Sequence, residues 1–250
     1  MYRKIENLKE VLENHLIYLE TGDLAKRADL SGADLSDVDL SGEILSGANL
    51  MGTDLYSANL NGALLNNANL SGANLSFAKL TGGILTGAKL NGAKLSFANL
   101  FNANLSFANL RFAKLNDTYL RGANMNGAKL SLALLKGADL IDANLSDVDL
   151  SGAILSGAKL SLALLKGANL RGADMSGTLL DSTDLSFADL RNANLKGADL
   201  KDAFLCFTDL IDVDLRGANM NGADLSGATM NGALLNNANL SGAEGLNGKK

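Results

Sequence analysis

Residues able to carry catalysis are scarce in this chain. His15 is the only histidine and Cys206 the only cysteine among 250 residues, and most of the sequence separates them. Nucleophilic catalysis and metal binding both need such groups close together, as in a Cys–His pair or a cluster of His and Cys ligands. The patterns CxxC, HExxH and GxxxxGK do not occur in the sequence either. We therefore expect a protein that is not an enzyme and that holds no metal and no cofactor.

Carboxylates are plentiful, and some recur at a spacing of twenty residues, as Asp189 and Asp209 do. Two carboxylates held close together could bind a cation, or one of them could keep its proton through a raised pKa. Whether they meet depends on the fold. In the repeat described next, an outward Asp or Asn at this position is better explained by a structural role.

A five-residue repeat must position every other side chain. Leu or Met occupies each fifth position from Leu30 to Leu240, 43 consecutive times, and two residues earlier stands a small residue, usually Ala. This period fits neither the α-helix nor the β-strand. A chain that turns a corner every five residues places all repeats equivalently, so four repeats predict a square coil of twenty residues. Glu43, at an otherwise small and inward position, predicts a local distortion or a bound water.

The repeat A-[D/N]-L-x-x, present for example at residues 33–35, 73–75 and 198–200, resembles the pentapeptide-repeat proteins, and in particular their Leu-centred members from cyanobacteria. The resemblance covers about residues 24–244. It implies an all-β solenoid, a right-handed quadrilateral β-helix of about eleven coils, with the Leu and the preceding small residue inward. It also implies a bacterial, cytoplasmic protein, with which the single cysteine agrees.

The sequence divides into a capping helix in residues 1–23, a solenoid in residues 24–244 and an irregular tail in residues 245–250. The helix, expected over residues 2–20, would cover the apolar end of the first coil, with His15 as a surface or packing residue. Its apolar residues recur at three- and four-residue steps: Ile5, Leu8, Leu12, Leu16 and Leu19.

The net charge of −5 is unevenly distributed. Residues 76–136 carry eight basic groups and one acidic group, whereas residues 1–75 have a net charge of −6 and residues 137–228 a net charge of −7. Such segregation either steers charged partners or is merely a solvated surface. We expect no nucleic-acid binding, because the lysines are dispersed and no aromatic platform is evident on the same face. No apolar run is long enough for a membrane span.

Outward apolar residues are the candidate interaction sites. In a twenty-residue coil Ile44, Leu64 and Ile84 fall on one face of three successive coils. Two aromatic pairs recur in the same way on opposite faces, Phe77 with Phe97 and Phe187 with Phe207. An exposed apolar strip indicates partner contact, and the alternative is self-packing along the wall of the solenoid.

These features favour a non-enzymatic rod that presents rows of side chains to an unidentified protein partner. The alternative, implied by the resemblance alone, is a DNA-mimicking protein that binds DNA gyrase and protects it from quinolones. The basic middle segment, the central Leu and the lack of a C-terminal helix depart from those mimics. An end-to-end homodimer through the last coil is a further expectation, because no helix follows that could cover its apolar layer: Leu225, Met230, Leu235 and Leu240.

Overall fold

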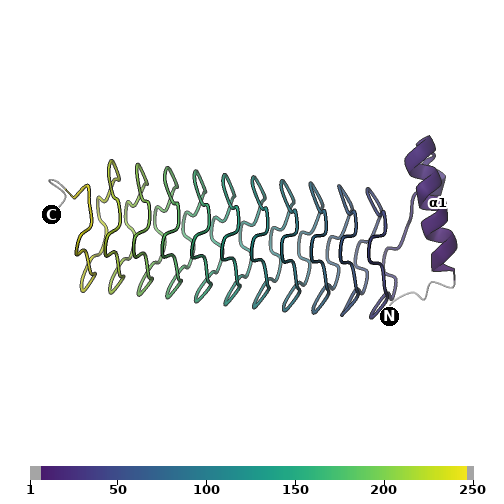
Figure 1. The fold of residues 1–250 in the computed structure, drawn as a ribbon, viewed down its shortest axis with the longest axis horizontal. Coiled ribbons are helices and arrows are strands. Elements are labelled where there is room, and N and C mark those ends of the chain that lie inside the picture. The colour runs from purple at the N-terminus through teal and green to yellow at the C-terminus, as the bar shows by residue number, and fades with distance from the viewer. Residues whose placement is uncertain (1–6, 247–250) are drawn as a thin grey trace.

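The computed structural model describes residues 7–246 and shows a long rod of stacked coils (Figure 1). Helix α1, Leu8–Thr21, lies across the end of the stack where the chain begins (Figure 1). A short 3-10 helix, η1, Leu24–Lys26, leads into the first coil. The described part of the chain contains no further helix, and none that is long and apolar enough to cross a membrane.

Parallel β-bridges join each coil to the next at a constant offset of twenty residues. Asp29 pairs with Asn49, and the same offset persists to the pair of Asp224 and Glu244. One residue of each repeat forms the bridge, so the wall is a ladder of isolated bridges rather than of extended strands. Four repeats therefore complete one coil, as the sequence predicts.

The coil has four sides. We identify each side by its outward, bridge-forming residue in the first coil, which directly precedes the central Leu. Side 1 begins at Asp29, side 2 at Asp34, side 3 at Asp39 and side 4 at Ile44, and each row continues every twenty residues. The two residues after each central Leu form the corner that leads to the next side.

Every amide of a repeat can be satisfied, which explains the composition of the repeat. Around Leu50, the amides of Asn49, Leu50 and Gly52 donate to carbonyls of neighbouring coils at 2.7–2.9 Å. The Thr53 amide closes the corner by donating to the Leu50 carbonyl at 3.2 Å, as in a β-turn. The Met51 amide donates to the side-chain oxygen of Asn49 at 3.3 Å. Asp and Asn thus precede the Leu because their side chains accept the fifth amide.

The second corner residue adopts a left-handed conformation. Gly is favoured there because it has no Cβ, and φ is 61° at Gly177. Other residues take the same conformation, including Ser57 at 55° and Phe77 at 62°. An L residue in this region costs about 1–2 kcal/mol, so each Phe at a corner is held there by the surrounding ladder.

The core is a column of Leu with Ala packed between them. Leu75 and Ala73 have no exposed surface, and Met175 replaces Leu with equal burial. Thr53, at an Ala position, is also buried because its hydroxyl donates to the Leu30 carbonyl at 2.7 Å.

Glu43 does not break the ladder. Its side chain is half-exposed, its amide donates to Leu40 at 3.2 Å, and its carbonyl accepts from Leu64 at 2.9 Å. The predicted local distortion is therefore not seen.

α1 contacts the first coil through a stripe that differs in part from the predicted one. The stripe consists of Leu8, Val11, Leu12 and His15. His15 is fully buried, and its Nδ1 accepts a hydrogen bond from the Ala28 amide at 3.1 Å. Leu16 and Leu19, predicted for this stripe, are 45% and 41% exposed, so that part of the prediction is wrong. Leu16 lies about 100° around the helix from His15, and Leu19 belongs to the last turn of α1. Ile5 lies outside the described residues.

The last coils are less well covered than the first. Leu225 is fully buried, contrary to expectation, whereas three residues of the final apolar layer are only partly buried: Met230, Leu235 and Leu240. Gly245 stands where the next Leu would be, and a Cβ there would lie 2.4 Å from the Ser226 nitrogen, so only Gly fits. Most of the predicted tail, residues 247–250, lies outside the described part. End-to-end pairing stays a prediction, which sedimentation at tens of micromolar tests.

Candidate functional site

The structure brings Ile44, Leu64 and Ile84 together on side 4. Parallel bridges join Ile44 to Leu64 and Leu64 to Ile84, so the three side chains form one row over three coils. Ile44 is 39% exposed, and the other two are half-buried. The placement is as the twenty-residue coil predicts, and the use of the row as a binding site stays a prediction.

The surroundings of this row are almost free of charge. Side 4 and its two corners comprise residues 41–47, 61–67, 81–87 and 101–107 in four successive coils, and Glu43 is their only charged residue. Depletion of charge is what distinguishes the centre of a protein interface from the remaining surface. We call these four stretches the side 4 surface.

Phe77 and Phe97 stack on one another at the corner between sides 2 and 3. Their ring centroids are 5.0 Å apart with an angle of 14° between the planes. Tyr56, which the sequence reasoning missed, extends the stack at 5.5 Å from Phe77. Its position one residue earlier in its repeat hid it from a search for residues exactly twenty apart.

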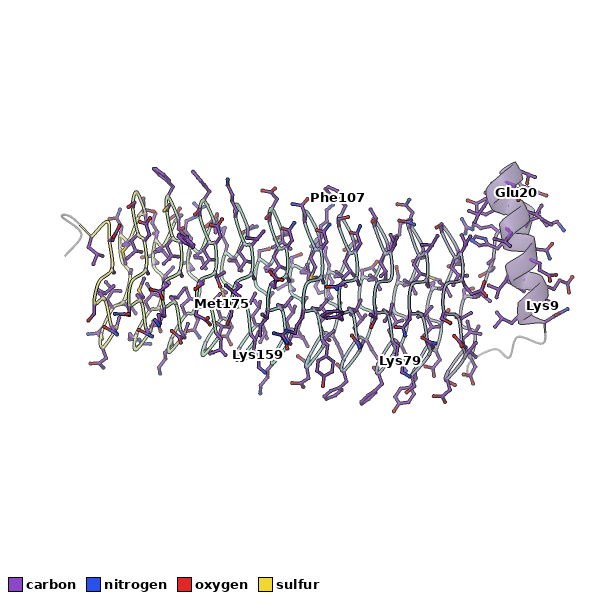
Figure 2. All side chains as sticks on the ribbon, viewed as in Figure 1. Lys9, Glu20, Lys79, Phe107, Lys159 and Met175 are labelled. Carbon is purple, nitrogen blue, oxygen red and sulfur yellow. The ribbon has the colours of Figure 1, made fainter. Side chains whose placement is uncertain are left out.

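Phe187 and Phe207 form the second stack, with centroids 5.3 Å apart and planes at 12°. They stand at the corner between sides 4 and 1, diagonally opposite the first stack, as predicted from the register. The Lys166 ammonium lies 5.6 Å from the centroid of Phe187. The same corner carries Phe107, which Figure 2 shows on the edge of the rod away from Lys79. Each stack covers its own backbone, so self-packing explains part of both.

The paired carboxylates of side 1 do not form a cation site. Asp189 and Asp209 face each other in the ladder, and Arg191 lies between them, 2.5 Å from Asp189 and 3.2 Å from Asp209. Hydrogen bonding to Arg191 lowers the pKa of Asp189. Within residues 7–246 no group of three or more His, Cys, Asp or Glu side chains could hold a metal ion.

His15 and Cys206 lie near opposite ends of the rod. The Cys206 thiol donates to the Asp224 carboxylate at 3.0 Å, and this bond and burial raise the pKa of the thiol. A raised pKa disfavours the thiolate, which is the reactive form. The two residues therefore do not make a nucleophilic pair.

A second candidate surface, half basic and half apolar, was missed by the sequence reasoning. The row of side 2 reads Lys94, Lys114, Leu134 and Ile154 in four successive coils. The signal was available in the sequence as residues twenty positions apart, but a row that changes from basic to apolar residues matches neither a pair of like charges nor an apolar strip.

The chain matches the family model described as pentapeptide repeats in eight copies. The copies cover residues 28–67, 68–106, 103–140, 128–167, 143–181, 158–197, 188–227 and 218–244. No curated protein matches the chain.

Several solved structures are similar to the chain. HetL from the cyanobacterium Nostoc, a pentapeptide repeat protein involved in heterocyst differentiation regulation, is 34% identical, with 91% of this chain and 94% of HetL covered and a TM-score of 0.50. Rfr23 from the cyanobacterium Cyanothece is 33% identical over 40% of this chain and 58% of its own, with a TM-score of 0.27. Full-length QnrB1, a plasmid-mediated fluoroquinolone resistance protein, is 19% identical over 80% of this chain and 90% of its own, with a TM-score of 0.30. The family match and the likeness to HetL each span most of the chain, which therefore belongs to the pentapeptide-repeat family, whose members fold as right-handed quadrilateral β-helices.

Proposed function

We propose that the protein is a non-enzymatic interaction rod whose side 4 surface docks on a protein partner. The observation that carries this proposal is a row of three adjacent apolar side chains on the side 4 surface, whose four stretches contain one charged residue, Glu43. An uncharged face with apolar residues at its centre has the anatomy of a protein interface. The β-helix supports such a role because a fully bonded wall changes shape little on binding.

In this proposal the rod consists of about eleven coils, and α1 closes its first coil as a cap. The buried hydrogen bond from Ala28 to His15 and the contacts of Leu8 and Leu12 support the capping role. A reducing cytoplasm is the compartment that a single cysteine suits. The likeness to HetL, a protein involved in regulation, supports a regulatory rather than a catalytic role.

Site-specific photo-crosslinking tests the side 4 surface. A photoreactive residue placed at Leu64 should give a discrete adduct in cells that make the protein. The same residue at Leu179, an exposed apolar position on side 3, should not give that adduct. Ile84→Lys should abolish the Leu64 adduct, because it places an ammonium in the uncharged row without touching the core. Equal adducts from Leu64 and Leu179, or an adduct that survives Ile84→Lys, would contradict the proposal.

The alternative function is DNA-mimicking binding to DNA gyrase. The acidic segments, residues 1–75 and 137–228, support it, and the net charge of +7 between them opposes it because a mimic of the duplex needs continuous negative charge. A gyrase supercoiling assay with and without a fluoroquinolone separates the two functions. Inhibition or protection at micromolar protein would favour the alternative, and no effect would discard it.

A further inference from the structure

We propose that side 2 binds an amphipathic α-helix of a partner protein, one whose contacting stripe carries two acidic residues followed by two apolar residues. The surface consists of the row Lys94, Lys114, Leu134 and Ile154 and of one flanking corner with Arg111, Phe112 and Leu132. It is on the opposite side of the rod from the side 4 surface. The two proposals can therefore be tested independently of each other.

The basic half of this surface has no charge partner of its own. Lys94 and Lys114 face each other across one β-bridge, and both are exposed. Neither ammonium forms an ion pair with any of residues 7–246. Like charges directly opposite each other in a ladder are destabilising. Arg191 and Arg216, by contrast, are each bonded to aspartates of the chain. Both ammonium groups can therefore form ion pairs with carboxylates of a partner.

The apolar half continues the same row without interruption. A bridge joins Leu134 to Ile154, which is 40% exposed. Along the flanking corner Phe112 is 55% exposed and Leu132 is 50% exposed. Leu132 lies over Gly152, where its Cδ2 would be 2.8 Å from a Cβ. Phe112 and Leu132, in adjacent coils, form the apolar edge of this surface.

Arg111 links the two halves of the surface. Its guanidinium carbon lies 5.7 Å from the centroid of Phe112, which places a cation beside the apolar edge. A partner that satisfies Lys94 and Lys114 with carboxylates and continues with apolar side chains would match the surface along its length.

The spacing of the row favours a helix over an extended peptide. Successive coils are about 4.8 Å apart, and one stripe of an α-helix advances about 5.4 Å per turn. The mismatch is about 0.6 Å per step, or about 2 Å over the three steps of the row. In an extended peptide, same-face side chains are about 6.6 Å apart, so the mismatch would exceed about 5 Å over the same row. A helix laid along the rod can therefore place one side chain on each coil.

Other anionic partners fit less of the surface. A nucleic acid would satisfy the lysines but leave Leu134 and Ile154 without a partner. The rings of Phe97 and Phe112 do border side 2, which removes one of the two grounds on which the sequence disfavoured nucleic acid, the lack of aromatic side chains on the same face. Nucleic acid is therefore included in the test. A planar anionic membrane would meet one side of the rod, whereas the cations continue to Lys89 on side 1 and Lys79 on side 3.

Fluorescence anisotropy with a designed peptide tests the inference. The probe is a labelled, Ala-based helical peptide of about eighteen residues with Glu at positions i and i+4 and Leu at i+7 and i+11, which form one stripe. The intact protein should bind it, and the double variant K94Q/K114Q should bind it at least tenfold more weakly. The matched control K159Q/K196Q removes the same charge elsewhere on the rod and should change affinity less than twofold.

Ile154→Asp should also weaken binding at least tenfold, and all variants should keep the circular dichroism of the parent, because the replaced side chains point outward. A peptide of the same composition with Glu and Leu alternating along the stripe should bind at least tenfold more weakly. The inference is overturned if the designed peptide does not bind at about 1 mM, a concentration that corresponds to very weak affinity. It is also overturned if the alternating peptide, or a single-stranded oligothymidine, binds as tightly through the same lysines.

Discussion

Lowering the pH from about 7.5 to about 5 should loosen α1 from the first coil, because His15 must stay neutral to hold it. Its Nδ1 accepts the hydrogen bond of the Ala28 amide, and a protonated imidazole has no acceptor left. The ring is fully buried, is stacked on Tyr18 at 5.4 Å and has its Nε2 without a hydrogen-bond partner within the described residues. Burial lowers the pKa of His15, the backbone of Ser46 opposes this shift, and the charge of Arg27 adds to it.

The direction of the effect follows from the lowered pKa. The undocked helix takes up a proton near pH 6.5, the usual value for His, whereas the docked helix does so only at a lower pH. Docking therefore has its full stability above about pH 6.5 and loses it as the pH falls toward the lowered pKa of the docked state. The loss is at most about 1.4 kcal/mol per pH unit in that window.

Hydrogen exchange across Leu8–Thr21, corrected for intrinsic rates, measures this loss locally. His15→Leu should weaken docking by about 1–3 kcal/mol at pH 7.5, because the Ala28 amide is left unpaired, and it should also remove the pH dependence. The ratio of the protection factors of the α1 amides in the wild type to those in His15→Leu should fall between pH 7.5 and 5. A ratio that stays constant over this range would refute the reasoning.

Three further predictions concern the solenoid itself. Leu75→Ala should lower the unfolding free energy by about 3–5 kcal/mol, because it leaves a cavity in the closed core. Leu235→Ala, in the partly exposed final layer, should lower it clearly less. Chemical denaturation of both variants measures the difference. Ser57→Gly should stabilise the protein by up to about 1 kcal/mol in a thermal melt, because φ at this residue is 55°. Arg216→Gln should raise the pKa of Asp214 from about 2 toward 3.8, as followed by NMR titration of the carboxyl carbon, because the side-chain hydrogen bond from Arg216 is the main cause of the lowered value.

The repeat predicts the fold because its five-residue period determines both which residues are buried and which coils are neighbours. A strict Leu repeat every five residues leaves one arrangement that buries every Leu. The structure shows the central residues from Leu30 to Leu225 buried, with bridges at an offset of twenty residues, and only the final layer partly exposed. The row of Ile44, Leu64 and Ile84 follows from the same arithmetic. Such placements need no knowledge of side-chain contacts.

Features outside the repeat were predicted less well, for identifiable reasons. The stripe of α1 includes a buried His15, which a search for apolar periodicity passes over, since its burial depends on a single backbone amide of the first coil. The stacking of the two Phe pairs was predicted, but their backbone conformation was not, because a bulky side chain disfavours positive φ and the surrounding ladder holds Phe77 there. The side 2 surface was missed because its row changes chemistry halfway.

Because every coil has twenty residues, an insertion or deletion of repeats can preserve the core while it rearranges the surface. Gain or loss of a single repeat would leave every Leu buried but turn all later outward residues by a quarter revolution about the rod. The chain carries a trace of such an event. The sequence of residues 61–73 recurs unchanged at residues 231–243, 170 positions or eight and a half coils later. Leu64 therefore faces one direction and its copy, Leu234, the opposite one, so a duplicated segment can acquire a new neighbour without any substitution.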